Sequence, residues 1–64
     1  MTKEQVIELR KSLGLTQEQF AAQLHVSVGA VRLWEQGLRS PKGLYLKALL
    51  EVRQATLQGG NSLG

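Results

Sequence analysis

The sequence predicts an all-α fold, a compact bundle of four to five helices. Apolar residues recur along it at intervals of three and four, and Ser or Thr residues that can cap a helix precede these runs. Glycines follow several of the runs, at positions where helices commonly stop. A chain of 64 residues has room for one small domain, and 42% hydrophobic with 20% charged residues is a globular composition with a packed core.

The first helix is expected over residues 3–13. Thr2 and Gln5 form a capping-box pattern, in which the hydroxyl and amide side chains each bond a free backbone N–H of the first turn. Apolar residues follow at helical spacing. Gly14 then stands where a helix often ends in the left-handed conformation, which glycine adopts without a Cβ clash.

Two further helices are expected over residues 17–24 and 28–36. Thr16, with a glutamine three residues later, repeats the capping-box pattern before the first of them. Ser27 is the expected N-cap of the second, because its hydroxyl can accept a hydrogen bond from a free N–H of the first turn. Gly37 is placed to end it.

The fourth helix is expected to begin at Ser40-Pro41, since Ser can cap and Pro at the first helical position loses an N–H that has no partner there. Several apolar residues share its expected core face: Leu44, Ala48, Leu49 and Val52. Gly59-Gly60 is expected to end this pattern, as one long helix or two short ones. The domain is therefore expected to cover residues 1–58, with residues 59–64 as a flexible tail.

Composition excludes several classes of function. There is no cysteine, no aspartate and a single histidine, which removes a disulfide framework, a cysteine-ligated zinc site and a thiol nucleophile. Neither an enzyme nor a metal or cofactor is therefore expected. No apolar run approaches the roughly 20 residues that span a membrane, and the first residues lack the apolar stretch of a signal peptide, so a cytoplasmic protein is expected. The net charge of +3 suits a polyanionic partner.

Residues 17–36 have the pattern of a helix-turn-helix. Ala21 allows the two helix backbones to approach closely, Val26 fills the turn, and Val31 and Trp34 anchor the second helix to the core. The opposite face of the second helix stays free, as in a recognition helix.

At these positions the sequence resembles the Cro/repressor (XRE) helix-turn-helix family, over roughly residues 6–52. The matching residues are Leu9, Arg10, Gly14, Leu15, Thr16, Gln17, Phe20, Ala21, Leu24, Val26, Ser27, Val31, Trp34, Glu35, Gly37 and Pro41. The resemblance implies a lambda-repressor-like helix-turn-helix fold and a sequence-specific transcriptional regulator that binds double-stranded DNA, most simply a repressor. Residues 41–43 with 49–52 look most like the compact members that serve as antitoxins.

One position departs from the family pattern. His25 stands in the turn where relatives usually have glycine, because the backbone there is left-handed. Histidine is among the residues enriched in that conformation, so we expect the turn to survive with about 1 kcal/mol of local strain.

The resemblance implies that the helix over residues 28–36 lies in the major groove, whose edges distinguish all four base pairs. With Val31 and Trp34 facing inward, helical geometry turns another set of residues outward. The expected base-reading residues are Val28, Gly29, Arg32 and Leu33. Arg32 is the expected guanine reader, because its planar fork matches O6 and N7; the alternative is a phosphate contact or a solvated side chain.

Phosphate contacts are expected from residues that flank this helix. They are Gln17, Ser27, Arg39, Ser40 and Lys42. Gln17 matches the backbone-binding glutamine of the family, while Ser27 and Ser40 are also expected caps. Arg10 and Glu35 match a recurring family pair, which we interpret as a structural ion pair.

The sequence leaves two questions open, the oligomeric state and the choice between a repressor and an antitoxin. A two-fold symmetric DNA site implies a homodimer, and Leu38, Tyr45, Leu46 and Leu57 are apolar residues that either supply its surface or belong to the core. The alternative function is an antitoxin that binds a toxin protein and autoregulates its operon; a toxin encoded beside the gene, and its co-purification, would separate the two.

Overall fold

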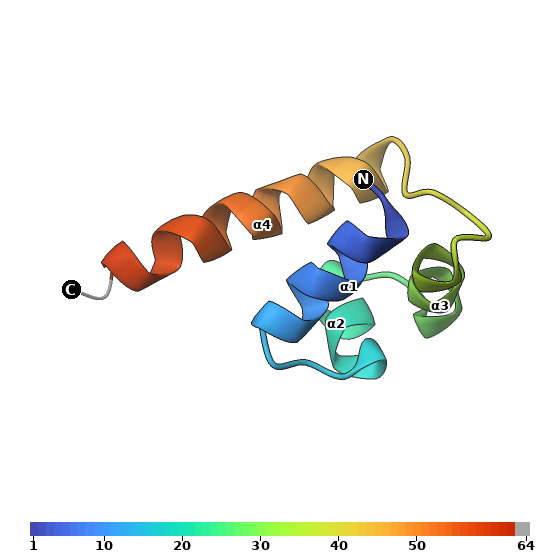
Figure 1. Ribbon diagram of the computed structural model, residues 1–64, viewed down its shortest axis with the longest axis horizontal. Helices are drawn as coiled ribbons and strands as arrows, with labels where there is room; N and C mark the ends of the chain where they lie inside the picture. The colour runs from blue at the N-terminus through green and yellow to red at the C-terminus, as the bar shows by residue number, and fades with distance from the viewer. Residues whose placement is uncertain (63–64) are drawn as a thin grey trace.

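Helices account for all the regular structure that is described (Figure 1). The computed structural model describes the backbone of residues 1–62 and the side chains of residues 1–56. The helices are α1 (Lys3–Ser12), α2 (Gln17–Leu24), α3 (Val28–Gln36) and α4 (Leu44–Ser62). No strand occurs within residues 1–62, so the predicted all-α fold is confirmed. α1, α2 and α3 lie together, and α4 runs along one side of them and continues past their edge.

The first three helices begin at the predicted caps. Thr2 Oγ1 accepts from the N–H of Gln5 at 3.2 Å, and Thr16 Oγ1 accepts from the N–H of Gln19 at 3.1 Å. Each glutamine side chain bonds back to the N–H of its threonine, which completes both capping boxes. Ser27 Oγ accepts from the N–H of Ala30 at 3.2 Å. These hydrogen bonds satisfy backbone N–H groups that have no partner within the helix. Because they join residues close in the chain, the sequence predicts where these three helices begin.

α2 ends at a left-handed residue, His25, with φ of 59° and ψ of 41°. The N–H of the next residue, Val26, bonds to the carbonyl of Ala21 at 3.0 Å and so closes the helix end. α3 ends in the same way at Gly37, with φ of 77°. The expected left-handed turn at His25 is therefore present, with a side chain that this conformation disfavours.

The core contains residues from every helix. Its buried members are Val6, Leu9, Phe20, Ala21, Leu24, Val31, Trp34 and Leu49. Leu15 and Val26, which follow the left-handed ends of α1 and α2, are partly buried and pack against this cluster. The core therefore lies between α1, α2, α3 and the first half of α4, and it fixes the orientation of α3.

The predicted start of the fourth helix at Ser40-Pro41 is wrong. Gly43 has φ of 57°, in the left-handed region, so a right-handed helix that began at Ser40-Pro41 could not continue through it into α4. α4 begins at Leu44, and the N–H of Tyr45 bonds to the carbonyl of Lys42 at 3.1 Å. Pro41 is buried instead of exposed at a helix start. The Ser-Pro pair therefore belongs to a loop that is anchored to the domain.

Two other details of α4 differ from expectation. Leu44, expected on the core face, is 82% exposed, whereas Leu49 is buried and Ala48 and Val52 pack against the core. The expected helix stop at Gly59-Gly60 is also wrong, since α4 runs to Ser62. Glycine disfavours a helix interior by about 1 kcal/mol without forbidding it. The tail predicted for residues 59–64 thus overlaps α4, and residues 63–64 lie outside the described residues.

Candidate nucleic-acid interface

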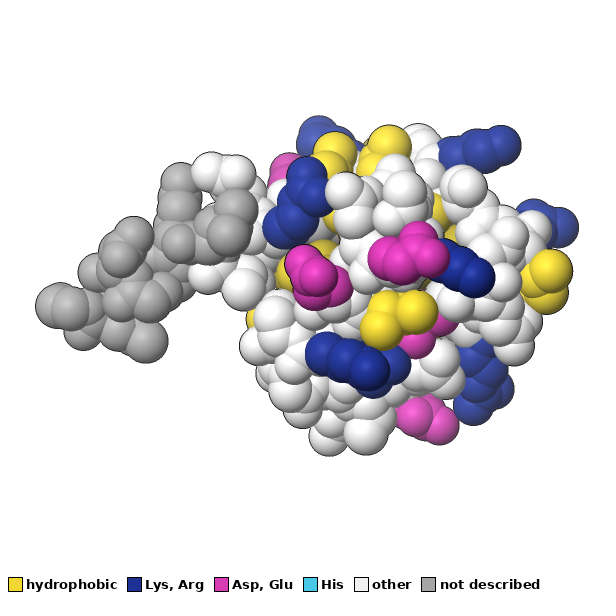
Figure 2. Space-filling model, in the orientation of Figure 1, with side chains coloured by type: hydrophobic (Ala, Val, Ile, Leu, Met, Phe, Trp, Pro, Cys, Tyr) yellow, Lys and Arg dark blue, Asp and Glu magenta, His cyan; other side chains and the backbone are white. Residues whose placement is uncertain are grey.

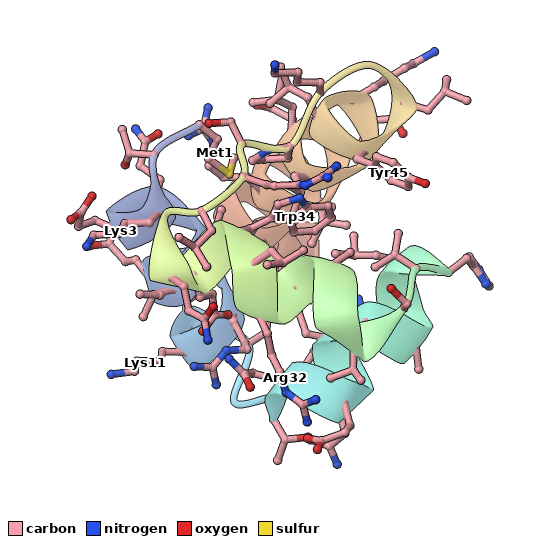
Figure 3. All side chains as sticks on the ribbon, turned by 90° about the vertical axis from the view of Figure 1, so that its right-hand side faces the viewer. Met1, Lys3, Lys11, Arg32, Trp34 and Tyr45 are labelled. Carbon is pink, nitrogen blue, oxygen red and sulfur yellow. The ribbon has the colours of Figure 1, made fainter. Side chains whose placement is uncertain are left out.

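α3 is fixed to the domain by one face. Val31 is fully buried and Trp34 is 4% exposed, and both belong to the core. The turn before α3 is closed by Val26, which is partly buried against the same core. Figure 3 shows Trp34 between α3 and α4, on the side of α3 away from Arg32. The opposite face of α3 is consequently left toward solvent.

A hydrogen-bonded network holds α3 to its neighbours. Arg10 of α1 donates from Nε to Glu35 Oε2 at 2.7 Å and from Nη2 to Oε1 at 3.1 Å. Arg10 Nη1 also donates to the carbonyl of Leu15 at 3.0 Å. Gln17, the first residue of α2, donates from Nε2 to Glu35 Oε1 at 3.1 Å. The ion pair expected between Arg10 and Glu35 is thus present and joins α1 to α3. The hydrogen bond from Gln17 adds α2 to this network.

This pair is shielded from water. The side chain of Arg10 is 17% exposed and that of Glu35 is 6% exposed. Hydrogen bonding to Glu35 raises the pKa of the Arg10 guanidinium above its ordinary value, against the lowering effect of burial and with the added attraction of the Glu35 charge. Because the pKa moves upward from an already high value, the Arg10 guanidinium keeps its positive charge toward Glu35.

The outward face of α3 differs in one respect from the sequence prediction. Gly29 and Arg32 are exposed and Leu33 is partly exposed, as expected. Val28, also expected to face outward, is partly buried and packs against the core. It is the first residue of α3, directly after the α2–α3 turn.

A shallow groove runs beside this face, between α3 and the α3–α4 loop. Its lining is Ser27, Gly29, Ala30, Leu33, Trp34, Arg39, Ser40, Lys42 and Tyr45. Tyr45 forms one wall, with its ring centroid 5.8 Å from that of Trp34 and the ring planes at 54° (Figure 3). The structure therefore brings two of the expected base-reading residues and four of the expected phosphate-binding residues into one groove.

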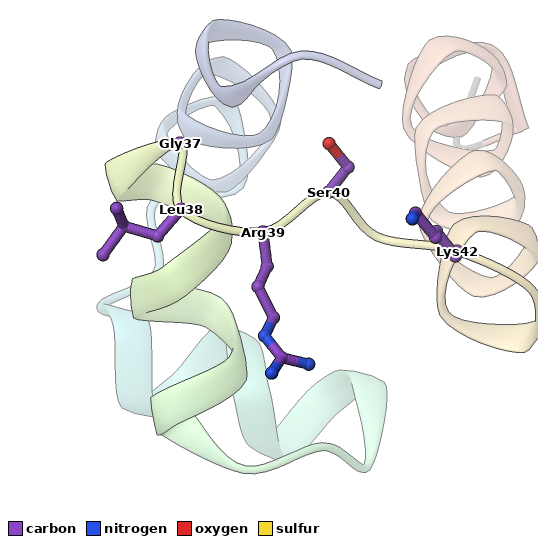
Figure 4. Close-up of a pocket in the computed structure, with 5 residues that line it drawn as sticks. All are labelled: Gly37, Leu38, Arg39, Ser40 and Lys42. Atoms are coloured by element: carbon purple, nitrogen blue, oxygen red, sulfur yellow. The ribbon is translucent and has the colours of Figure 1, made fainter.

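Two cations of the loop stand without acidic partners in the part of the chain that the structure describes. Arg39 and Lys42 are exposed, and neither forms an ion pair there. In Figure 4 the side chain of Arg39 extends beside α3, and Lys42 lies at the far end of the loop, close to α4. Cations so placed along one side of a groove are suited to the phosphates that flank a base-pair edge.

A family model described as helix-turn-helix matches residues 6–57. The chain belongs to this helix-turn-helix family. The resemblance to the Cro/repressor (XRE) type is thereby confirmed, and the protein is a DNA-binding helix-turn-helix regulator. Comparison with curated proteins and with solved structures found no match.

Sequence reasoning overlooked two residues of this helix-turn-helix surface. Gln36 is exposed on α3, and since it follows Arg32 by four residues the helical period alone places both on one face. Glu18 of α2 lies against Arg32, with 3.4 Å between Oε2 and Nη2. No periodicity could reveal that contact, because the two residues are on different helices.

Other parts of the helix-turn-helix domain are less suited to a polyanion. Figure 2 shows acidic and basic side chains interspersed on the face that carries α1, so phosphates find no continuous positive surface there. In the described residues no group of three or more His, Cys, Asp or Glu side chains is arranged to hold a metal ion. Within the same residues, none of the helices has the length and apolar character required to cross a membrane.

Proposed function

We propose that this helix-turn-helix protein is a sequence-specific transcriptional repressor that inserts α3 into the major groove of double-stranded DNA. The observation that carries the proposal is the exposed face of α3, with Arg32 on it, beside a groove whose loop presents Arg39 and Lys42, two cations that form no ion pair with residues 1–56. A single α-helix fits the major groove, and cations beside it place the protein on the duplex through phosphates.

Base reading is assigned to the exposed face of α3. Arg32 offers a planar pair of donors to guanine O6 and N7, a contact that discriminates by about 1–3 kcal/mol. Gly29 leaves room for a base edge, since a Cβ added there would meet only Ser27 Oγ at 3.8 Å. Leu33 and the uncovered part of Val28 supply apolar contact to a thymine methyl group.

Phosphate binding is assigned to Arg39, Lys42 and Ser40 of the loop, together with two residues that already make internal bonds. Gln17 Nε2 carries two hydrogens, and the bond to Glu35 uses one of them, so the other is available to a phosphate oxygen. Ser27 Oγ accepts from the backbone of α3 and keeps its own O–H to donate. These contacts fix the register of α3 without reading sequence.

The protein is proposed to act as a homodimer on a two-fold symmetric site, which doubles the number of base pairs that α3 reads. Exposed apolar residues near the loop are available for such a contact: Leu38 is 69% exposed, Leu44 82% and Tyr45 53%. The side chain of Leu57 lies outside the described residues, and Leu46 is partly buried. The antitoxin alternative stays a prediction from the sequence.

The division of labour on DNA is tested by comparing two substitutions. Arg32→Ala is expected to relax preference at one or two base positions, with a loss of about 5- to 150-fold on the preferred duplex. Lys42→Ala is expected to weaken binding to every duplex alike and to lower the slope of log affinity against log salt by about one. Fluorescence anisotropy over a salt series measures both, and identical effects of the two changes on all duplexes would contradict the assignment.

A further inference from the structure

An ion pair crosses from α2 to α3 on the proposed DNA-binding face. Arg32 Nη2 lies 3.4 Å from Glu18 Oε2, and the two side chains are 50% and 67% exposed. Figure 3 shows Arg32 extending from α3 toward α2. The residue assigned to read guanine is therefore held by a carboxylate of its own chain when DNA is absent.

This pair is built differently from the structural pair of the domain. Arg10 and Glu35 share two hydrogen bonds of 2.7 and 3.1 Å away from water, whereas Arg32 and Glu18 share one long contact in solvent. Exposed pairs of this kind contribute little to stability. The Glu18 contact can thus open when a better partner for Arg32 arrives, and its loss leaves the fold intact.

The position of Glu18 adds a second argument. It lies in the first turn of α2, directly after Gln17, one of the residues assigned to phosphate. The amide end of a helix attracts anions, and a carboxylate placed there competes with the phosphate that would otherwise bind. On a surface that binds a polyanion, such a charge lowers affinity for every duplex.

We propose that Glu18 is a specificity-determining residue, which acts by positioning Arg32; this inference rests on the proposed function. Glu18 restrains the guanidinium from contacting phosphates of any sequence. A guanine in the major groove of the DNA offers Arg32 two acceptors, O6 and N7, in place of the carboxylate, and so compensates for the broken pair. At other base pairs Arg32 stays with Glu18, and binding is weaker.

The test compares Glu18→Gln with Glu51→Gln. Both remove one negative charge, and Glu51 is exposed on α4 with no ion pair within the described residues. Glu18→Gln is expected to raise affinity for a duplex without a preferred site about threefold more than the control does, and to steepen the salt slope by about one as Arg32 gains a phosphate. The ratio of preferred to non-preferred affinity is expected to fall about threefold relative to the control.

The same substitutions in an Arg32→Ala background separate positioning from simple charge. There, Glu18→Gln is expected to change the ratio of preferred to non-preferred affinity no more than Glu51→Gln does, because its remaining effect, on the phosphate at the start of α2, is the same for every duplex. An unchanged affinity ratio in the single variant, or an equal fall in the Arg32→Ala background, would overturn the inference while the proposed function stands. Absence of any duplex preference in the unaltered chain would overturn the proposed function and this inference together.

Discussion

Trp34→Ala is expected to abolish the cooperative thermal unfolding transition at 25 °C and above. Trp34 is 4% exposed and joins α3 to the core, and a large-to-small change at such a site costs about 3–5 kcal/mol. A domain of this size, without disulfides, has a total stability of only a few kcal/mol. Circular dichroism at 222 nm is the suitable measurement, because Trp34 is the single tryptophan and its fluorescence is lost with it.

The control for this change is Leu38→Ala, which also removes a large apolar side chain. Leu38 is 69% exposed, so its truncation is expected to shift the free energy of unfolding by less than about 0.5 kcal/mol. A Trp34→Ala variant that kept a cooperative transition would show that the core is not arranged around this residue.

Arg10→Met is expected to lower the free energy of unfolding by about 2–3 kcal/mol, because it leaves the Glu35 carboxylate shielded from water without its charged partner. Methionine keeps much of the aliphatic packing of Arg10, so the loss reports mainly on the pair. Urea denaturation followed by circular dichroism measures it. Among the proposed substitutions away from the core it has the largest expected effect on stability.

The matched variant is Arg10→Met combined with Glu35→Met. Replacing both members of a shielded pair by apolar side chains is often close to neutral, so the double variant is expected to regain most of the lost stability. A coupling free energy below about 0.5 kcal/mol in this double-mutant cycle would mean that the two residues act independently, against the network seen between α1, α2 and α3.

The sequence predicts α1, α2 and α3 to within one residue, since their limits are set locally. Thr2, Thr16 and Ser27 bond N–H groups three residues ahead, and the left-handed ends at His25 and Gly37 close on nearby carbonyls. Signals of this kind depend only on neighbours in the chain, so the sequence predicts them without knowledge of tertiary contacts.

The start of α4 was not predictable in the same way. Ser40-Pro41 satisfies the local rules for a helix start, yet the burial of Pro41 and the positive φ of Gly43 belong to a loop packed on the rest of the domain. The candidate site shows the same limit. Helical period turns Gly29 and Arg32 outward correctly, but only tertiary packing covers part of Val28 against the core and brings Glu18 to Arg32.

Selection from a random library of duplexes, at roughly physiological salt, tests the central claim most directly. Salt at this level weakens contacts to phosphate alone, so enrichment must come from base reading by α3. The expected result is an inverted repeat whose half-sites lie about one helical turn apart. A folded protein that enriched no sequence would contradict the assignment of α3 as a reader of DNA.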